Sequence, residues 1–277
     1  MPPTVTGNDP SRKTLCLVIP TYNERDNIQT LIERIEKIRS LLTFNLVIQI
    51  VDDNSPDNTA EIVKELVKQW DNIRLMERPQ PTGLGSAYLD GFSRCFDEYN
   101  PDFLGEMDAD LQHPPEILPE MCRVASSGKN VVIASRYVKG GGASEWSIGR
   151  KLVSKGANIL TKLFLRAPVS DATSGFRILS SSLVKGLLQK EVSSKGYAFQ
   201  VESLYVYKKL GASFAEVPFE FEVRRAGKTK LSWKEILRFA KSVIKTGVFG
   251  VKDRPLPLEA ASEIDPMQVS VERSQNS

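Results

Sequence analysis

"TLCLVIPTYNERDNIQTLIERIEKIRSLLTFNLVIQIVDD" (residues 14–53) decides the fold class of this chain. Two apolar runs of strand length, 14–20 and 45–53, flank a segment whose apolar residues recur at helical spacing. A strand, a helix and a second strand in this order form a parallel pair, and the crossover between them is right-handed. The stretch therefore predicts an α/β protein with a parallel sheet.

The same alternation continues beyond this stretch. A helix is expected over 55–70, with Ser55 or Asp57 as its N-cap, followed by a strand over 72–78. A glycine-containing turn and a helix over 82–96 lead to a strand over 102–110. Later elements are strands within 131–137 and 213–224, helices over 145–166, 196–211 and 232–251, and a loop, a short strand and a helix within 169–188. The pattern predicts one mostly parallel sheet with helices on both faces.

Composition limits the class of protein further. The 277 residues are 41% hydrophobic and 26% charged, which suits one large domain with an ample core. A net charge of +3 is too small to argue for a nucleic-acid partner. Three widely spaced cysteines favour buried thiols in a reducing compartment, and no secretion signal or membrane-spanning run is present. We expect a disordered arm over 1–13, a folded domain over 14–251 and a disordered acidic tail over 252–277.

Polar clusters follow three of the expected strands. They are Pro20 to Glu24, then Asp52 and Asp53, then Asp108 to Asp110. In open parallel sheets, ligands bind at the carboxyl ends of the strands. We therefore expect the three clusters at one edge of the sheet.

The third cluster has the chemistry of a cation site. Asp108, Asp110 and Gln112 offer oxygen ligands, which suit Mg²⁺ or Mn²⁺ held jointly with phosphate groups. A solvated acidic turn is the alternative. Asp52 and Asp53 suit hydrogen bonds to a nucleobase or ribose, or alternatively a role at the start of the next helix.

Other segments lack the motifs of several common enzyme classes, which excludes those classes. The turn at 82–87, "TGLGSA", has neither the full dinucleotide-binding glycine pattern nor a phosphate-binding lysine. The single histidine, His113, lies beside a proline pair, where a turn role is favoured over catalysis. Without a histidine base, an acceptor that is already anionic is the better fit.

Several motifs together resemble those of dolichyl-phosphate mannosyltransferases, inverting members of glycosyltransferase family 2 with the GT-A fold. The resemblance covers about residues 14–245 and rests on the following segments: "VIPTYNERDNI", "IVDDNSPDNT", "MDADLQHPPEILP", "ASRYVKGGG", "RKLVSKGANILTKLFLR", "SDATSGFR" and "SKGYAFQVE". The later segments narrow the resemblance to those family members that transfer a sugar onto a polyprenyl phosphate.

The resemblance implies a role for each matching position. The donor-binding positions are Pro20, Tyr22, Glu24, Val51, Asp52, Asp53, Asp108, Ala109, Asp110, Gln112, Arg224 and Lys230. The positions implied to hold Mg²⁺ or Mn²⁺ are Asp108, Asp110 and Gln112. The acceptor phosphate is assigned to Arg136, Arg150 and Ser154, and the catalytic set to Asp110, Arg136 and Lys230.

The implied reaction moves mannose from GDP-mannose to dolichyl phosphate with inversion, giving dolichyl β-D-mannosyl phosphate for glycosylation and GPI-anchor pathways. A relative that uses UDP-glucose or another nucleotide sugar is the alternative, and a non-catalytic scaffold subunit is the third reading. The family implies peripheral attachment at the cytosolic face of the endoplasmic reticulum membrane. Small transmembrane partner subunits are also implied, because the chain resembles the short form without membrane helices.

Two segments have the pattern of membrane-interface helices. Residues 146–166 and 233–251 combine an apolar face with flanking lysines and arginines. Packing of these helices on the sheet is the alternative interpretation.

Overall fold

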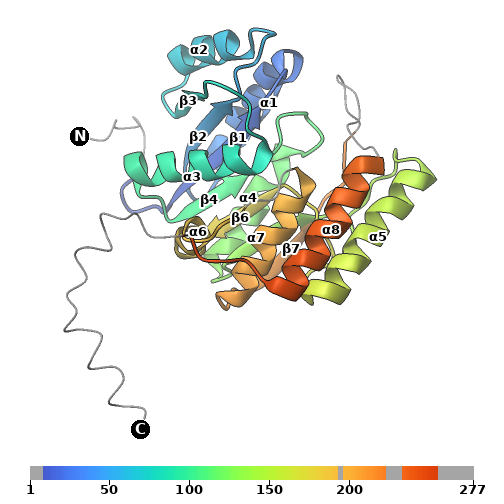
Figure 1. Ribbon diagram of the computed structural model, residues 1–277. Coiled ribbons are helices and arrows are strands. Elements are labelled where there is room, and N and C mark those ends of the chain that lie inside the picture. The colour runs from blue at the N-terminus through green and yellow to red at the C-terminus, as the bar shows by residue number, and fades with distance from the viewer. Residues whose placement is uncertain (1–8, 193–195, 223–232, 255–277) are drawn as a thin grey trace, which may run out of the picture.

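The computed structural model describes residues 9–192, 196–222 and 233–254 (Figure 1). Within these residues seven strands form one sheet in the order β3-β2-β1-β4-β6-β5-β7. They are β1 (Thr14–Thr21), β2 (Asn45–Asp52), β3 (Ile73–Glu77), β4 (Phe103–Glu106), β5 (Val131–Ser135), β6 (Arg177–Ser180) and β7 (Phe214–Pro218). Neighbouring strands are parallel except where β6 pairs with β4 and β5. The predicted, mostly parallel α/β fold is confirmed.

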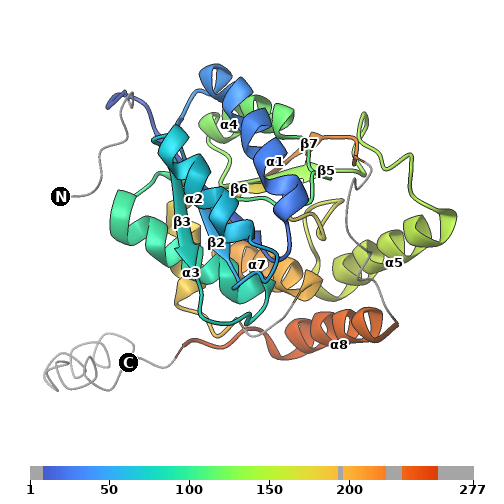
Figure 2. The ribbon, with the colours of Figure 1, turned by 90° about the horizontal axis from the view of Figure 1, so that it is seen from above.

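Two layers of helix enclose the sheet (Figure 2). One apolar core joins the sheet to α1 (Arg25–Ile38), α2 (Thr59–Gln69) and α4 (Leu118–Ser126). A second core on the other face joins it to α3 (Leu84–Tyr99), α6 (Ser181–Leu188) and α7 (Tyr197–Lys209). Along β1, Leu15 and Leu17 point into the first core and Cys16 and Val18 into the second, as the two-residue strand period requires. Cys16, Cys95 and Cys122 are free and buried in these cores.

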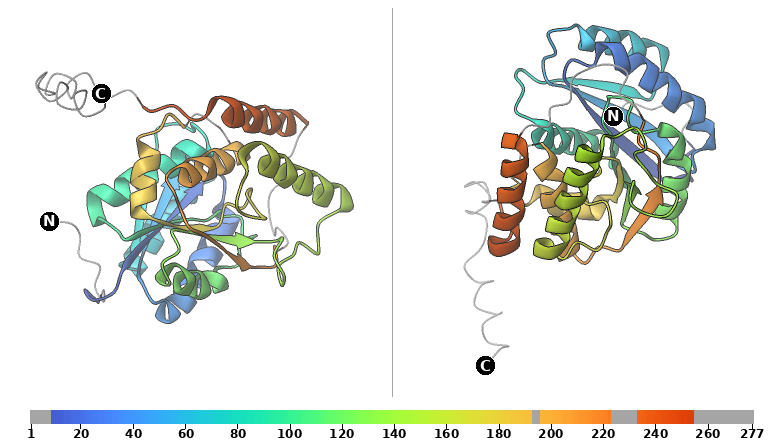
Figure 3. Two further views of the ribbon diagram at one scale, coloured as in Figure 1. Left: turned by 90° about the horizontal axis from the view of Figure 1, so that it is seen from below. Right: turned by 90° about the vertical axis from the view of Figure 1, so that its right-hand side faces the viewer.

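Two helices, α5 (Ile148–Leu165) and α8 (Trp233–Phe249), lie outside this sandwich. They pack against each other, and α8 also packs against α7 (Figure 3). Only Thr161 and Leu165 of α5 are buried, so this helix is not packed on the sheet. The alternative of two helices covering the sheet is therefore wrong, because α3, α6 and α7 already cover that face. Across the part of the chain that the structure describes, no helix has the length and apolarity needed to cross a bilayer.

Several predicted boundaries shift in the structure. Helix α2 begins at Thr59, after Asn58 adopts a left-handed backbone (φ 65°), although the Asp57 carboxylate still accepts the Thr59 N–H at 3.0 Å. Strand β4 ends at Glu106, so the polar cluster that follows belongs to a loop. The sequence analysis also missed α4 and the short 3₁₀ turns η1 (Arg39–Leu41) and η2 (Pro115–Ile117). Pro119 obscures α4 in the sequence, but it stands in the first helical turn, where no backbone N–H is needed.

The structure also extends past both predicted domain ends. The Asn45 amide donates to the Asp9 carbonyl at 2.7 Å, which ties residues from 9 onward to β2. At the other end, Glu191 N–H donates to the Lys252 carbonyl at 2.9 Å, and Arg254 N–H to the Gln189 carbonyl at 2.8 Å. Backbone hydrogen bonds therefore hold short parts of the segments predicted as arm and tail.

Candidate active site

A cavity of about 340 Å³ lies beyond the end of β4, between the sheet and the outer helix pair. One part of its wall is polar and includes Asp108, Asp110, Gln112, Arg136, Arg150, Ser154 and Glu235. The other part is apolar and comprises Trp146, Val153, Leu160, Phe221, Ile236 and Phe239. The structure thus brings the residues predicted for the metal and those predicted for the acceptor phosphate to one cavity.

The loop after β4 carries Asp108 at the cavity wall. The Tyr88 hydroxyl donates to Asp108 Oδ1 at 3.4 Å, and the Asp108 backbone N–H donates to Nδ1 of His113 at 3.4 Å. His113 is buried among Phe176, Phe219 and Phe221, so its ring supports the loop.

Asp110 and Gln112 are oriented by a strained turn between them. Leu111 has a left-handed backbone (φ 63°), which is costly for a leucine and is typical of functional sites. The Gln112 N–H donates to Asp110 Oδ1 at 3.1 Å. The Gln112 side chain donates to the Glu222 carbonyl at 3.2 Å, while Glu222 N–H donates back to the Gln112 carbonyl at 3.1 Å. With Nε2 used in this way, the amide oxygen of Gln112 is its remaining ligand atom.

These donor atoms fit a hard divalent cation. Asp108, Asp110 and Gln112 supply carboxylate and amide oxygens on one wall, and two carboxylates with phosphate oxygens make a typical Mg²⁺ or Mn²⁺ shell. The described residues contain no cluster of three or more histidine, cysteine or acidic side chains arranged around one metal position. A cation here therefore needs further ligands, of the kind a nucleotide diphosphate provides.

Behind this wall lies a fully buried charged pair, Glu106 and Arg177. The two residues face each other across the antiparallel pairing of β4 with β6, with Arg177 Nε 3.9 Å from Glu106 Oε2. Arg177 donates to the carbonyls of Ala172, Ser174 and Gln200 at 2.8 to 2.9 Å. Burial raises the pKa of Glu106 to about 7, and Arg177 opposes this rise. The pair links β4 to the loop over 172–175, whose Thr173, Ser174 and Gly175 line the cavity.

Arg136 is the most firmly held of the predicted acceptor residues. Its Nε and Nη2 donate to the two carboxylate oxygens of Asp171 at 2.7 and 2.6 Å, and Nη2 also donates to Thr173 Oγ1 at 2.9 Å. Such a bidentate pair fixes the plane of the guanidinium. On α5, Ser154 accepts a hydrogen bond from the Tyr137 hydroxyl at 2.7 Å, and Arg150 lies one turn earlier.

Asp52 and Asp53 lie apart from the cavity. Asp52 is buried and accepts hydrogen bonds from Thr21 Oγ1 at 2.8 Å, Ser55 Oγ at 2.7 Å and Ser55 N–H at 2.8 Å. It therefore joins the polar ends of β1 and β2, as the parallel register predicts. Asp53 pairs with Arg78, whose Nη1 is 2.8 Å from Asp53 Oδ1. Burial raises the pKa of Asp53, and Arg78 opposes the rise.

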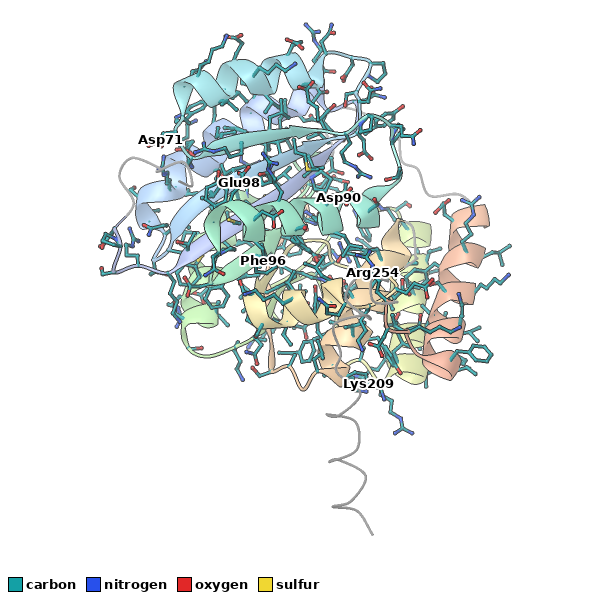
Figure 4. All side chains as sticks on the ribbon, turned by 60° about the vertical axis from the view of Figure 1, so that its left-hand side comes forward. Asp71, Asp90, Phe96, Glu98, Lys209 and Arg254 are labelled. Carbon is teal, nitrogen blue, oxygen red and sulfur yellow. The ribbon has the colours of Figure 1, made fainter. Side chains whose placement is uncertain are left out.

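Arg78 also connects this edge to α3. Its Nε lies 3.2 Å from Asp90 Oδ2, and Figure 4 labels Asp90 on that helix. Asp53 and Arg78 are thus part of a charged group of three at the end of β2.

The other predicted donor residues are spread over the same edge. Tyr22 is exposed, Pro20 and Glu24 are half-buried, and Val51 and Ala109 are packed in the apolar cores. None of these five lines the cavity. Arg224 and Lys230 lie outside the described residues.

The structure adds four cavity or support residues that the sequence analysis did not assign. They are Asp171 and Thr173, which hold Arg136, and Trp146 and Phe221, which pack beside the arginines. The only sequence signal for the first two was the motif "SDATSGFR". Trp146 and Phe221 are far apart in the chain, and nothing in the sequence pairs them.

Known sequences resemble this chain over most of its length. The profile described as "Glycosyl transferase family 2" matches residues 16–188. A dolichol-phosphate mannosyltransferase of Pyrococcus furiosus is 36% identical over 231 residues, which is 83% of this chain and 62% of that protein. The chain thus spans under two thirds of that relative. A polyprenol monophosphomannose synthase of Mycolicibacterium smegmatis is 35% identical over 88% of this chain and 91% of that protein.

Solved structures share the fold at lower identity. Mannosyl-3-phosphoglycerate synthase from Rubrobacter xylanophilus has a TM-score of 0.61 and 20% identity, covering 84% of this chain and 72% of its own. Glucosyl-3-phosphoglycerate synthase from Mycobacterium tuberculosis, solved with Mn²⁺ and UDP-glucose, has a TM-score of 0.60 and 18% identity, covering 84% and 77%. The profile match, the two relatives and the shared fold confirm the resemblance predicted from the motifs: the chain belongs to glycosyltransferase family 2.

Proposed function

We propose that this protein transfers mannose from GDP-mannose to a polyprenyl phosphate, dolichyl phosphate in the predicted reaction, with inversion at the anomeric carbon. The single observation that carries the proposal is the cavity. It combines oxygen ligands for a diphosphate-bound cation, two arginines suited to a phosphate, and an apolar wall suited to a lipid chain. The names of the two relatives, both polyprenol-phosphate mannose enzymes, support the same acceptor class.

The acceptor needs no general base in this reaction. A phosphate monoester is ionised near pH 7, so its oxygen attacks the anomeric carbon directly. The new bond joins that carbon to the acceptor phosphate, and the bond to the GDP oxygen breaks on the opposite face. Arg136 and Arg150 hold the acceptor phosphate at the cavity wall, and this orientation supplies much of the rate.

The donor side is assigned to the loop after β4. Asp108, Asp110 and Gln112 would hold Mg²⁺ or Mn²⁺, which neutralises charge on the leaving diphosphate. Because Tyr88 and the Leu111 turn fix this loop, its oxygens meet the ligand in one orientation. Arg224 and Lys230 stay predictions for the diphosphate, and Asp52 and Asp53 for the nucleoside side.

Access for the lipid is assigned to the outer helix pair. α5 exposes Ile148, Leu152, Ile159 and Leu163, and α8 exposes Leu237, Val248 and Phe249, each above 59%. Exposed cations flank them, including Lys155, Lys162, Lys241 and Lys245. Apolar faces rimmed by cations are typical of helices that lie in a membrane interface. Attachment at the cytosolic face of the endoplasmic reticulum and small transmembrane partner subunits stay predictions.

The donor is tested by a direct comparison. The purified protein is incubated with a short polyprenyl phosphate, Mg²⁺ or Mn²⁺, and either GDP-mannose or UDP-glucose, and lipid-linked sugar is measured. We expect transfer from GDP-mannose. Labelling of the lipid by UDP-glucose alone would establish the alternative donor, and no transfer from any nucleotide sugar would favour a scaffold subunit.

The site is tested by Asp110→Asn. This variant keeps the hydrogen bond from Gln112 N–H but loses the carboxylate charge, so transfer should fall at least about a hundredfold. An unchanged thermal midpoint separates this loss from unfolding. Asp71→Asn, on the loop between α2 and β3, is the matched control and should retain activity.

A further inference from the structure

Two guanidinium groups at the cavity wall share one aromatic side chain. The guanidinium carbon of Arg150 lies 4.0 Å from the ring centre of Trp146, and that of Arg136 lies 5.0 Å from it. Phe221 stands edge-on to Trp146, with 5.0 Å between ring centres. Its own centre is 5.4 Å from Arg136 and 5.7 Å from Arg150. Trp146 and Phe221 therefore form an aromatic pair beside both arginines.

Two positive charges beside one ring repel each other unless something opposes the repulsion. The Asp171 carboxylate balances Arg136 through two hydrogen bonds. The negative face of an aromatic ring attracts guanidinium groups, and Trp has the strongest such face. The aromatic pair thus helps the two cations to stay together at the wall of the cavity.

We propose that Trp146, supported by Phe221, is a positioning residue that holds Arg150 and Arg136 as a prearranged pair for the phosphate of the acceptor. The inference rests on the proposed function, since it takes a lipid phosphate as the ligand. Trp146 acts through the arginines: loss of its face removes one of the contacts that restrain Arg150, at a cost in affinity. Trp146 also lines the cavity, so its effect on the charged head must be separated from contact with the lipid chain.

The test compares a phosphate with its neutral alcohol. Calorimetry measures the Kd of a short polyprenyl phosphate and of the corresponding polyprenol for wild type, Trp146→Leu, Trp146→Phe and Phe221→Leu. Trp146→Leu should weaken phosphate binding roughly tenfold, and the two variants that keep an aromatic ring at position 146 should weaken it about two- to threefold. Binding of the alcohol should change less than twofold. In the transfer assay, KM for the lipid phosphate should rise while kcat at saturation stays within about threefold.

The control is Trp70→Leu, a half-buried tryptophan that follows α2, away from the cavity. It should leave both dissociation constants unchanged. Equal losses for phosphate and alcohol in Trp146→Leu would reduce Trp146 to a lipid contact and overturn the inference. If Trp146→Leu does not fold, wild-type phosphate affinity in Trp146→Phe and Phe221→Leu overturns it instead.

The same experiment also tests the proposed function, separately from the role of Trp146. Failure of wild-type protein to bind the short polyprenyl phosphate rejects the acceptor itself, and the inference falls with it. Normal wild-type binding with unchanged variants rejects the role of Trp146 alone.

Discussion

At the scale of single residues, fully buried charged groups explain how part of the site is held in place. Arg177 and Glu106 are both fully buried, and Arg177 donates to carbonyls on the cavity loop and on α7. Isolated buried charges are costly, so each group is tolerable only because the other is present. The pair therefore fixes the loop that holds Gly175 against Asp108, where an added Cβ would lie 3.3 Å from Oδ2.

Replacing Arg177 by methionine should lower the free energy of unfolding by about 3–5 kcal/mol, because it leaves the Glu106 carboxyl buried without its partner. The double variant Arg177→Met with Glu106→Gln should lose clearly less than the single one. Urea unfolding measures both. Arg123→Met, at an exposed pair with Glu120, serves as control and should change stability by less than about 0.5 kcal/mol.

Asp57, just before α2, makes a contribution to the stability of the fold that depends on pH. Burial acts to raise its pKa, but hydrogen bonds from Thr59 and the Arg25 N–H outweigh it, so the pKa is lowered below its ordinary 3.8. Because the pKa is lowered on folding, the ionised carboxylate stabilises the fold at pH values above 3.8, the pKa in the unfolded chain. This stabilisation is lost as the pH falls through the pKa of the folded state. Asp57→Ala should thus cost about 1 kcal/mol at pH 7.

The difference between wild type and Asp57→Ala should shrink below pH 3.8. Urea unfolding at several pH values measures it. A difference that stays constant from pH 7 down to pH 3 would contradict a role for the ionised carboxylate.

At the scale of elements, the outer helix pair depends on one close contact. A Cβ added at Gly247 of α8 would lie 2.9 Å from the Phe164 carbonyl oxygen of α5, a backbone atom that cannot turn aside. Leu165, Val201 and Val243 form a small apolar cluster at this end of the pair. The cavity is lined nearer the other end of the pair, by residues from Arg150 to Leu160 of α5 and from Glu235 to Ala240 of α8. Close packing at one end thus sets the spacing at the cavity.

Gly247→Ala should force α8 away from α5. Overpacking of this kind costs about 1–3 kcal/mol, which should lower the thermal midpoint. The KM for the lipid phosphate should change as well, because the cavity wall moves. Gly149→Ala is the matched control: no atom lies within 4 Å of its added Cβ, and alanine favours a helix, so stability should stay equal or rise. Equal effects of the two variants would contradict the contact as described.

At the scale of the whole molecule, apolar exposure is concentrated on one side. Of the described side chains, α5 and α8 carry nine of the twelve large exposed hydrophobic residues, while the sheet and its covering helices bury theirs. Both helices, which lie side by side in Figure 1, contribute residues to the cavity that would take the lipid head group. Exposed apolar side chains gathered on one surface in this way are typical of an interaction site, and the flanking cations favour an anionic lipid surface.

The variant Leu163→Ser with Phe249→Ser should bind anionic vesicles at least about tenfold more weakly than wild type, since each side chain contributes apolar burial in the interface. Co-sedimentation with phosphatidylserine-containing vesicles measures this. The matched control is Leu41→Ser, after α1. The Leu41 side chain is 64% exposed, which is close to the 71% of Leu163. If the control loses as much binding as the double variant, the patch is not the membrane surface.

Sequence patterns alone were enough to predict the fold class and the family. Apolar periodicity reports which faces are buried, so runs such as 14–20 and 45–53 predicted strands, and their order predicted the parallel sheet. Strand order also predicted that the polar ends of β1 and β2 meet, as the hydrogen bond from Thr21 to Asp52 confirms. Motif order along the chain pointed to glycosyltransferase family 2, which the comparisons confirm.

Which side chains converge depends on the packing of the whole chain. Periodicity carries no information on partners far away in the chain, so the pairs Glu106 with Arg177 and Trp146 with Phe221 had no sequence signal. For the same reason, the sequence did not show that Asp52 and Asp108, which both follow strands, have different surroundings. Asp52 is enclosed by Thr21 and Ser55, while the loop after β4 places Asp108 on the cavity wall. Long-range packing sets such contacts, and the local pattern of residues does not encode it.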